Sequence, residues 1–178
     1  MKFKPSQYSD GAVVARLNVA SKPVTYGKGK RPPISALTVT GQRQYDNTPN
    51  ANQTANLNLM ADFIARIPFE VTINSGFRSY NVNKAVGGDP SSQHMTGLGV
   101  DINPVDPKLG TLKSGGANRA LAAWFYEHKD EFPELDQVIW YMTTTHTHVG
   151  IVPVGAVADP IGLPATPGKG RKQFKIKL

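Results

Sequence analysis

Hydrophobic residues recur at helical spacing in two stretches of the chain. In the first stretch the apolar positions are Leu57, Met60, Ala61, Ile64 and Ile67. Thr54 is the expected N-cap of this helix, and Pro68 stops it. A second helix is expected from Ala117 to about Lys129, with Ser114 or a neighbour as its cap.

Apolar and polar residues alternate in several short segments, which is typical of half-buried strands. The clearest segments are Val71–Gly76, Leu98–Ile102, Gln137–Tyr141 and His146–Val152. The runs Ala12–Val14 and Ala36–Val39 are further candidate strands, residues 82–86 are expected to form a helical turn, and residues 174–178 form either an edge strand or a disordered tail. The pattern predicts an α+β fold, with a small antiparallel sheet packed against two main helices.

The predicted elements concentrate in residues 53–152, which we take as the core of the domain. Residues 1–52 are rich in Gly, Pro, Asn, Ser and Thr and form an N-terminal extension that either belongs to the domain or recognises a partner. Residues 153–178 are a Pro/Gly-rich segment with a basic tail. No run approaches the roughly 18 apolar residues of a membrane span, and no signal peptide with an apolar region is visible at the N-terminus.

The composition excludes cysteine chemistry, and the distribution of charge suggests a polyanionic partner. The 178 residues include no cysteine, so disulfides, thiolate metal clusters and cysteine nucleophiles are excluded. The net charge of +7 is concentrated at the two ends, since residues 1–31 carry seven Lys/Arg and one acid and residues 169–178 carry five and none. Such ends favour attraction to a polyanion, namely nucleic acid, an anionic cell wall or a membrane surface, or serve solubility alone.

Three of the four histidines lie beside the predicted strands. His146 and His148 are two residues apart, so on a strand both imidazoles project to one face, while Val149 and Ile151 point to the core. A pair of surface histidines without a function would give the same pattern. His94 lies seven residues before Asp101, across a join from loop to strand. Two histidines and one carboxylate would leave a fourth position for water, which is the catalytic form of a zinc site.

At these residues the chain resembles a known family. The run VTINSGFRSYNVNKAVGGDPSSQHMTGLGVDI, followed by LDQVIW and HTHVGI, is similar to the zinc D-Ala-D-Ala carboxypeptidase-like peptidases. This group includes phage L-alanyl-D-glutamate endolysins and is distantly related to the hedgehog domain. The family pattern Ser-x-His-x-x-Gly-x-(small)-x-Asp is matched by Ser92, His94, Gly97, Gly99 and Asp101. The His-x-His pair and an upstream Gly-Phe-Arg-Ser element that contains Arg78 complete the resemblance.

The resemblance implies a role for each matched residue. His94, Asp101 and His148 would be the zinc ligands, and His146 would lie beside the metal without binding it. Arg78 would meet a substrate carboxylate or carbonyl, although a purely structural ion pair is the alternative. Ser92 and Gln93 would shape the loop or contact the substrate.

One departure from the family pattern concerns the general base. Many relatives place a Glu or Asp shortly before the last ligand, whereas this chain has Tyr-Met-Thr-Thr-Thr at positions 141–145. Either His146 accepts the proton or an acid from elsewhere does so, with Asp136 and Asp106 as candidates.

The resemblance thus implies a zinc metallopeptidase that hydrolyses peptide bonds of bacterial peptidoglycan, in the stem peptide or the cross-bridge. We expect a monomer, although nothing in the sequence reports the oligomeric state. We expect a phage endolysin or a virion-associated cell-wall hydrolase, made in the host cytoplasm and acting on the cell wall. A bacterial enzyme that remodels the wall is the rival. A non-catalytic, zinc-containing module that binds the wall or a protein partner is the alternative. A nucleic-acid binder is a third reading, but no motif supports it.

Overall fold

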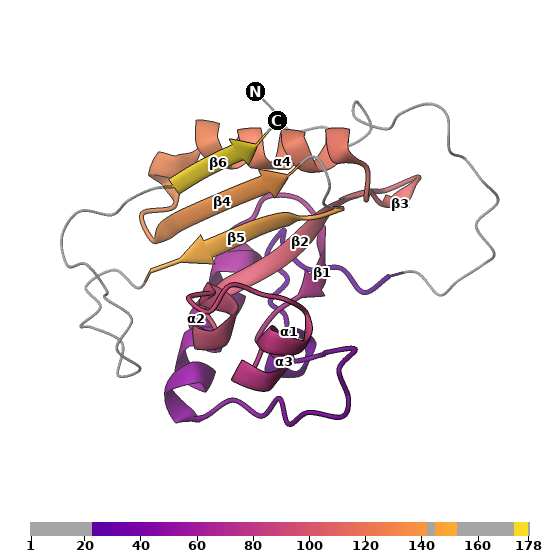
Figure 1. The fold of residues 1–178 in the computed structure, drawn as a ribbon. Helices are drawn as coiled ribbons and strands as arrows, with labels where there is room; N and C mark the ends of the chain where they lie inside the picture. The colour runs from indigo at the N-terminus through magenta and orange to yellow at the C-terminus, as the bar shows by residue number, and fades with distance from the viewer. Residues whose placement is uncertain (1–22, 142–144, 153–172, 178) are drawn as a thin grey trace.

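A computed structural model describes residues 23–141, 145–152 and 173–177, and these residues include six strands and two main helices (Figure 1). The helical elements are α1 (Ile34–Leu37), α2 (Ala51–Arg66), α3 (Tyr80–Ala85), η2 (Gln93–Thr96), α4 (Gly115–Glu127) and η3 (Lys129–Glu131). The strands are β1 (Val71–Ser75), β2 (Gly99–Asp106), β3 (Gly110–Thr111), β4 (Leu135–Tyr141), β5 (Thr147–Ile151) and β6 (Gln173–Lys177). None of the helices in these ranges is long and apolar enough to cross a membrane.

The strands form one sheet in the order β1-β2-β5-β4-β6, and the short β3 pairs with β2. Every pair is antiparallel except β4 with β6, which run parallel. The expected α+β class, a small antiparallel sheet against two main helices, is confirmed. Of the two predictions for the C-terminal tail, the edge strand is confirmed, because β6 pairs with β4 at the edge of the sheet (Figure 1).

The helix α2 begins at a different cap from the one predicted. Asn50 is the N-cap: its side chain accepts a hydrogen bond from the Gln53 N–H, and the Gln53 side chain accepts one from the Asn50 N–H. Thr54 lies inside the first turn, so the prediction of Thr54 as cap was wrong. The reciprocal Asn50–Gln53 pair satisfies two backbone donors that a lone Thr54 cap would leave unpaired.

The prediction of a strand at Ala36–Val39 was wrong. Ile34–Leu37 forms the short helix α1, and Leu37 is fully buried in the core. A mainly apolar stretch of four residues does not distinguish a strand from a single helical turn, and Leu37 reaches the core from a helix. The other candidate strand, Ala12–Val14, lies outside the described residues.

One face of the sheet carries the core. The predicted inward residues Val149 and Ile151 are buried, as are Val100, Ile102 and Val138 from the neighbouring strands. The helices α2 and α4 meet over this face through aromatic rings. Phe63 lies 6.1 Å from Phe125 and 5.3 Å from Phe132, measured between ring centroids. Because side chains alternate along a strand, Asp101 on β2 and His148 on β5 project from the opposite face.

Candidate metal centre

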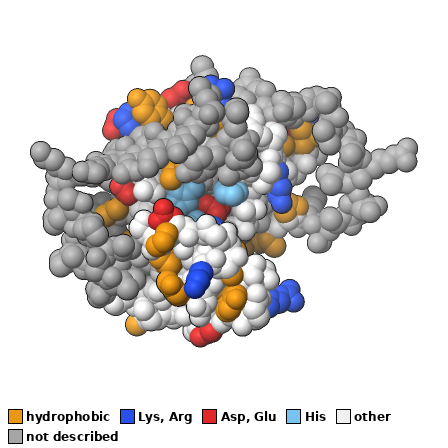
Figure 2. Space-filling model, in the orientation of Figure 1, with side chains coloured by type: hydrophobic (Ala, Val, Ile, Leu, Met, Phe, Trp, Pro, Cys, Tyr) orange, Lys and Arg blue, Asp and Glu red, His pale blue; other side chains and the backbone are white. Residues whose placement is uncertain are grey.

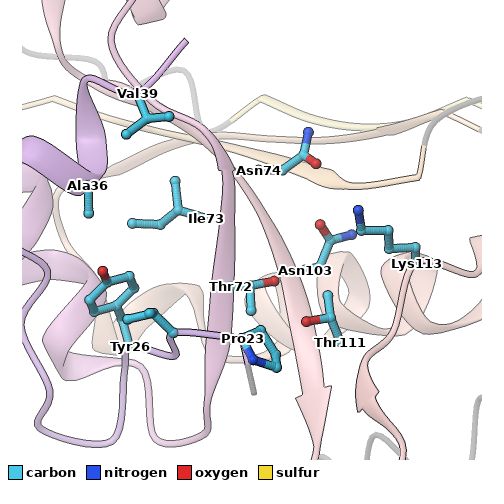
Figure 3. Close-up of a pocket in the computed structure, with 11 residues that line it drawn as sticks. Pro23, Tyr26, Ala36, Val39, Thr72, Ile73, Asn74, Asn103, Thr111 and Lys113 are labelled. Atoms are coloured by element: carbon cyan, nitrogen blue, oxygen red, sulfur yellow. The ribbon is translucent and has the colours of Figure 1, made fainter. Parts of the chain in front are cut away.

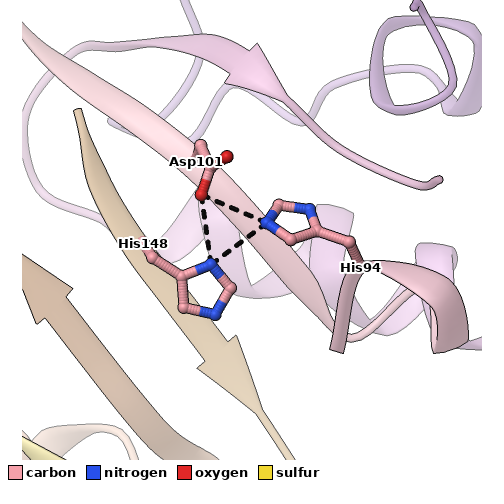
Figure 4. A group of neighbouring side chains, drawn as sticks. All are labelled: His94, Asp101 and His148. Carbon is pink, nitrogen blue, oxygen red and sulfur yellow. Dashed lines mark hydrogen bonds and ion pairs between the residues drawn. The ribbon is translucent and has the colours of Figure 1, made fainter. Parts of the chain in front are cut away.

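Three predicted side chains from distant parts of the chain meet on the polar face of the sheet. Asp101 on β2 and His148 on β5 are direct partners across the antiparallel pair, so their side chains share a face. His94 reaches them from η2 (Figure 4). The His94 Nε2, His148 Nδ1 and Asp101 Oδ1 atoms form a triangle with three sides of 3.1 Å.

The size of this triangle suits a metal ion. A tetrahedral ion with bonds of about 2.0 Å to nitrogen and oxygen holds its ligand atoms about 3.3 Å apart. His94 and Asp101 are 2% and 3% exposed, whereas the His148 side chain is 14% exposed. In the space-filling view, histidine and acidic side chains are visible together in the middle of this face (Figure 2). The group could therefore hold a divalent metal.

A backbone carbonyl orients His94. Its Nδ1 lies 2.6 Å from the carbonyl oxygen of Gly76, which can only accept a hydrogen bond. The proton therefore lies on Nδ1, and in the neutral ring Nε2 keeps its lone pair for a metal. Gly76 is required because a Cβ there would lie 2.2 Å from the Leu37 carbonyl oxygen. Sequence reasoning missed this contact, since a backbone carbonyl carries no sequence signal of its own.

Asp101 is the charged centre of the cluster. Burial raises the pKa of its carboxyl group, but the charges and hydrogen bonds of His94 and His148 outweigh burial and hold that pKa well below its usual range. Burial lowers the pKa of the His148 imidazole, and the contact with Asp101 opposes this only in part. At neutral pH the site therefore holds a carboxylate beside a neutral imidazole, the protonation states that bind a metal.

Arg78 contacts the second oxygen of Asp101. Its Nη2 lies 2.7 Å from Asp101 Oδ2, and its Nε donates to the Ser75 hydroxyl at 3.0 Å. The two oxygens of Asp101 thus have different partners, Oδ1 the histidines and Oδ2 the guanidinium. Among the described residues Nη1 of Arg78 has no hydrogen-bond partner, and the side chain is 17% exposed. The guanidinium of Arg78 thus forms a structural ion pair with Asp101, which is the alternative role for Arg78. Its Nη1 is still available to donate to a substrate oxygen.

His146 lies at the edge of the cluster. Its Nε2 is 3.7 Å from Asp101 Oδ2, and its side chain is 26% exposed. It is outside the group of three whose donor atoms converge. His146 thus lies beside the potential ligands, and its role in proton transfer stays a prediction.

The loop residues Ser92 and Gln93 have structural contacts. The Ser92 side chain caps η2 by accepting a hydrogen bond from the His94 N–H. Gln93 extends over Gly150, where a Cβ would lie 1.7 Å from its Oε1, and donates to Asp136 Oδ2 at 3.0 Å. Gly150 thus leaves room for a side chain that joins the His94 loop to β4. Contact of Ser92 and Gln93 with substrate stays a prediction.

The two candidate acids differ in their surroundings. Asp106 is 4% exposed and accepts hydrogen bonds from the backbone N–H groups of Lys108 and Leu109, so it stabilises the turn between β2 and β3. Asp136 is half-buried, and burial raises its pKa against the opposing hydrogen bond from Gln93. Of the two acids, Asp136 has the closer link to the cluster, through Gln93.

The loop turn before β2 depends on Gly97, which has a φ of +81°. A Cβ at Gly97 would lie 2.9 Å from the Gln53 carbonyl oxygen. We expect Gly97→Ala to lower the free energy of unfolding by about 2 kcal/mol or more, since a left-handed conformation costs an alanine about 1–2 kcal/mol before any steric clash. Urea denaturation measures this loss.

A matched control is available at Gly87, which has a φ of +69° but no heavy atom within 4 Å of an added Cβ. Gly87→Ala should therefore show only the conformational cost, about 1 kcal/mol. If the two variants lose the same free energy of unfolding, the close approach of Gly97 to α2 does not contribute to stability.

The fold and the cluster together define a candidate metal-dependent enzyme, with two histidines and an aspartate on the open face of an α+β sheet. The family model of peptidase M15 matches residues 34–150, which is well over half of the chain. The protein belongs to this family and is a metallopeptidase, so the resemblance found in the sequence is confirmed. A search of the curated proteins found no match.

Proposed function

We propose that the protein is a zinc-dependent peptidase that hydrolyses peptide bonds in bacterial peptidoglycan. The single observation that carries this proposal is the triangle of donor atoms from His94, Asp101 and His148, each 3.1 Å from the others. Membership of the peptidase M15 family and the resemblance of the sequence motifs to those of peptidoglycan-cutting peptidases support the substrate class. Two imidazoles and one carboxylate are a donor set that suits zinc.

His94, Asp101 and His148 would hold the zinc ion. When bound there, zinc would supply Lewis-acid catalysis to peptide hydrolysis. The carbonyl of Gly76 holds the His94 ring in place, and Arg78 holds Asp101 through its Oδ2. These contacts fix the direction of the donor atoms before any metal binds, which reduces the cost of forming the site.

Two further side chains would act on the substrate. Arg78 would bind a carboxylate or carbonyl oxygen through its free Nη1, because a guanidinium offers directed donors to such an oxygen. His146 would move a proton at Nε2, first accepting it from water and later passing it to the leaving amine. The side chain of His146 is 26% exposed, so water can reach the imidazole.

Turnover on purified peptidoglycan tests this function. The full chain should release soluble fragments, lose this activity with a chelator and regain it with zinc. Mass spectrometry of the fragments will then distinguish a carboxypeptidase from an endopeptidase. Wall binding with no fragments in the presence of zinc would instead favour the non-catalytic module.

We further propose that the protein acts as a phage endolysin or virion-associated hydrolase. The similarity to phage L-alanyl-D-glutamate endolysins supports this, and the basic ends suit an anionic wall. Addition to permeabilised bacteria should lower turbidity within minutes. Cleavage of peptidoglycan fragments without lysis of such cells would instead indicate a remodelling enzyme.

The division of the chain at residue 53 stays a prediction, and the structure suggests a refinement. Leu37 is fully buried against the core, and its carbonyl oxygen accepts a hydrogen bond from the Phe77 N–H at 2.6 Å. We propose that the catalytic unit includes α1. A truncation that begins at residue 53 should therefore be less stable than one that begins at residue 23, as thermal unfolding can measure.

Arg78→Ala should lower kcat/KM by roughly 100-fold while the chain remains folded, because a charged hydrogen bond to the substrate contributes on the order of 2–3 kcal/mol. The exposed Arg31, which pairs with Asp62, offers a matched control, and Arg31→Ala should leave kcat/KM unchanged. Equal kinetics for both variants would contradict the role of Arg78. Circular dichroism will show whether each variant is folded.

A further inference from the structure

A pocket of about 380 Å³ lies along β1, one of the two edge strands of the sheet. Tyr26, Val39 and Ile73 form an apolar wall, and polar side chains gather at the other end (Figure 3). Figure 3 shows the amides of Asn74 and Asn103 and the ammonium of Lys113 at this polar end. Nothing in the known chemistry of the metal centre assigns a role to this pocket.

The side-chain oxygen of Asn103 is a hydrogen-bond acceptor with no donor among the described residues. The residue is 1% exposed, and its Nδ2 donates to the carbonyl oxygen of Thr145 and to Asn118 Oδ1. Its Oδ1 is buried and has no hydrogen-bond partner in the part of the chain that the structure describes. A buried carbonyl without a donor is unfavourable, so this atom is suited to accept an N–H from a ligand.

Lys113 supplies a positive charge at the same end. Its side chain is exposed, and within the described ranges it forms no ion pair. An ammonium beside amide groups, opposite an apolar wall, suits an amphiphilic ligand with a carboxylate. A peptide that carries a free carboxylate combines this charge with the N–H that Asn103 can bind.

The pocket lies near the metal centre along a single strand. Asn103 follows Asp101 by two positions on β2, which corresponds to about 7 Å. An extended peptide advances about 3.3–3.6 Å per residue. A peptide bound across the cluster would therefore reach Asn103 with a residue about two positions from the bond at the metal.

We propose that this pocket is a substrate subsite for a carboxylate-bearing peptide. The Asn103 Oδ1 accepts a peptide N–H, and Lys113 pairs with a carboxylate about two residues from the bond that is cut. This inference rests on the proposed function, because it assigns the pocket to the same peptide. The inference goes beyond that function because it predicts that the enzyme prefers a substrate peptide with a free carboxylate over the same peptide with that carboxylate amidated.

The test uses two stem peptides that differ only in one carboxylate, which is free in the first and amidated in the second. Calorimetry on the full chain in chelator gives the affinities without hydrolysis, and kinetics after zinc is restored give KM and kcat. We expect the free carboxylate to bind about tenfold more tightly and to lower KM with little change in kcat. Lys113→Gln should remove this preference.

Lys108→Gln is the matched control, since Lys108 is also exposed but does not line the pocket. This variant should keep the tenfold preference. A third peptide, N-methylated two residues from the scissile bond, tests Asn103 and should bind about fivefold or more weakly. The proposal is overturned if the wild-type chain shows no preference, if Lys113→Gln keeps it, or if N-methylation has no effect.

The two hypotheses fail in different ways. Binding with a carboxylate preference but without hydrolysis in zinc would overturn the proposed function and leave the subsite supported. Hydrolysis without a carboxylate preference would overturn the subsite and leave the proposed function supported.

Discussion

Asp101→Asn is expected to lose bound metal and peptidase activity together. Asparagine keeps the shape of the side chain but removes the charge at the centre of the cluster, where Asp101 contacts His94, His148 and Arg78. Metal affinity should fall by more than roughly 100-fold. Even the loss of a residue that only hydrogen-bonds to a metal ligand lowers metal affinity by about 10–100-fold, and Asp101 is itself a proposed ligand. Competition with a chromogenic chelator measures the affinity, and peptidoglycan turnover measures the activity.

The same substitution should destabilise the metal-free protein. The guanidinium of Arg78, which is 17% exposed, would lose its anionic partner, at a cost on the order of 1–3 kcal/mol. Asp62→Asn is the matched control, because Asp62 also pairs with an arginine but its side chain is 62% exposed. That variant should change stability by less than about 1 kcal/mol and leave metal binding intact. Full metal occupancy in Asp101→Asn would refute the assignment of Asp101 as a ligand.

His146→Ala is expected to keep its metal and lose most of its turnover. His146 lies outside the triangle of donor atoms but has its Nε2 3.7 Å from Asp101 Oδ2. Removing a group that transfers a proton typically costs 10²–10⁴-fold in rate, so kcat should fall by about that factor. The measurement combines metal content after gel filtration with kcat on a defined muropeptide.

A second histidine offers the control for this variant. His128 ends α4, stacks on Trp124 at 4.4 Å between ring centroids and lies outside the triangle. His128→Gln should leave both metal content and kcat unchanged. If His146→Ala loses its metal, the ligand assignment is wrong; if its kcat is unchanged, Asp136 becomes the candidate for proton transfer.

Elements with a long periodic pattern could be predicted from the sequence. The apolar stripe of α2 and the Ser114 cap of α4 were found in this way, because periodic burial and caps depend on nearby residues. The Ala36–Val39 segment and the Thr54 cap were wrong. The first prediction failed because the place of Leu37 in the core depends on tertiary contacts, which a four-residue pattern does not encode. The second failed although its signal was local, because the reciprocal pair of Asn50 with Gln53 spans only three residues.

The amino-acid order by itself determined the family, the α+β class and the three side chains that converge, because His94, Asp101 and His148 stand in a spaced pattern of specific residue types. Only the tertiary structure decided which atoms face one another. It placed Asp101 Oδ1 beside the histidines and Asp101 Oδ2 beside Arg78, and among the described residues it gave the side-chain oxygen of Asn103, at the pocket, no hydrogen-bond partner. These contacts join segments that are distant in sequence, so they exist only after the strands have paired and the loops have closed over them.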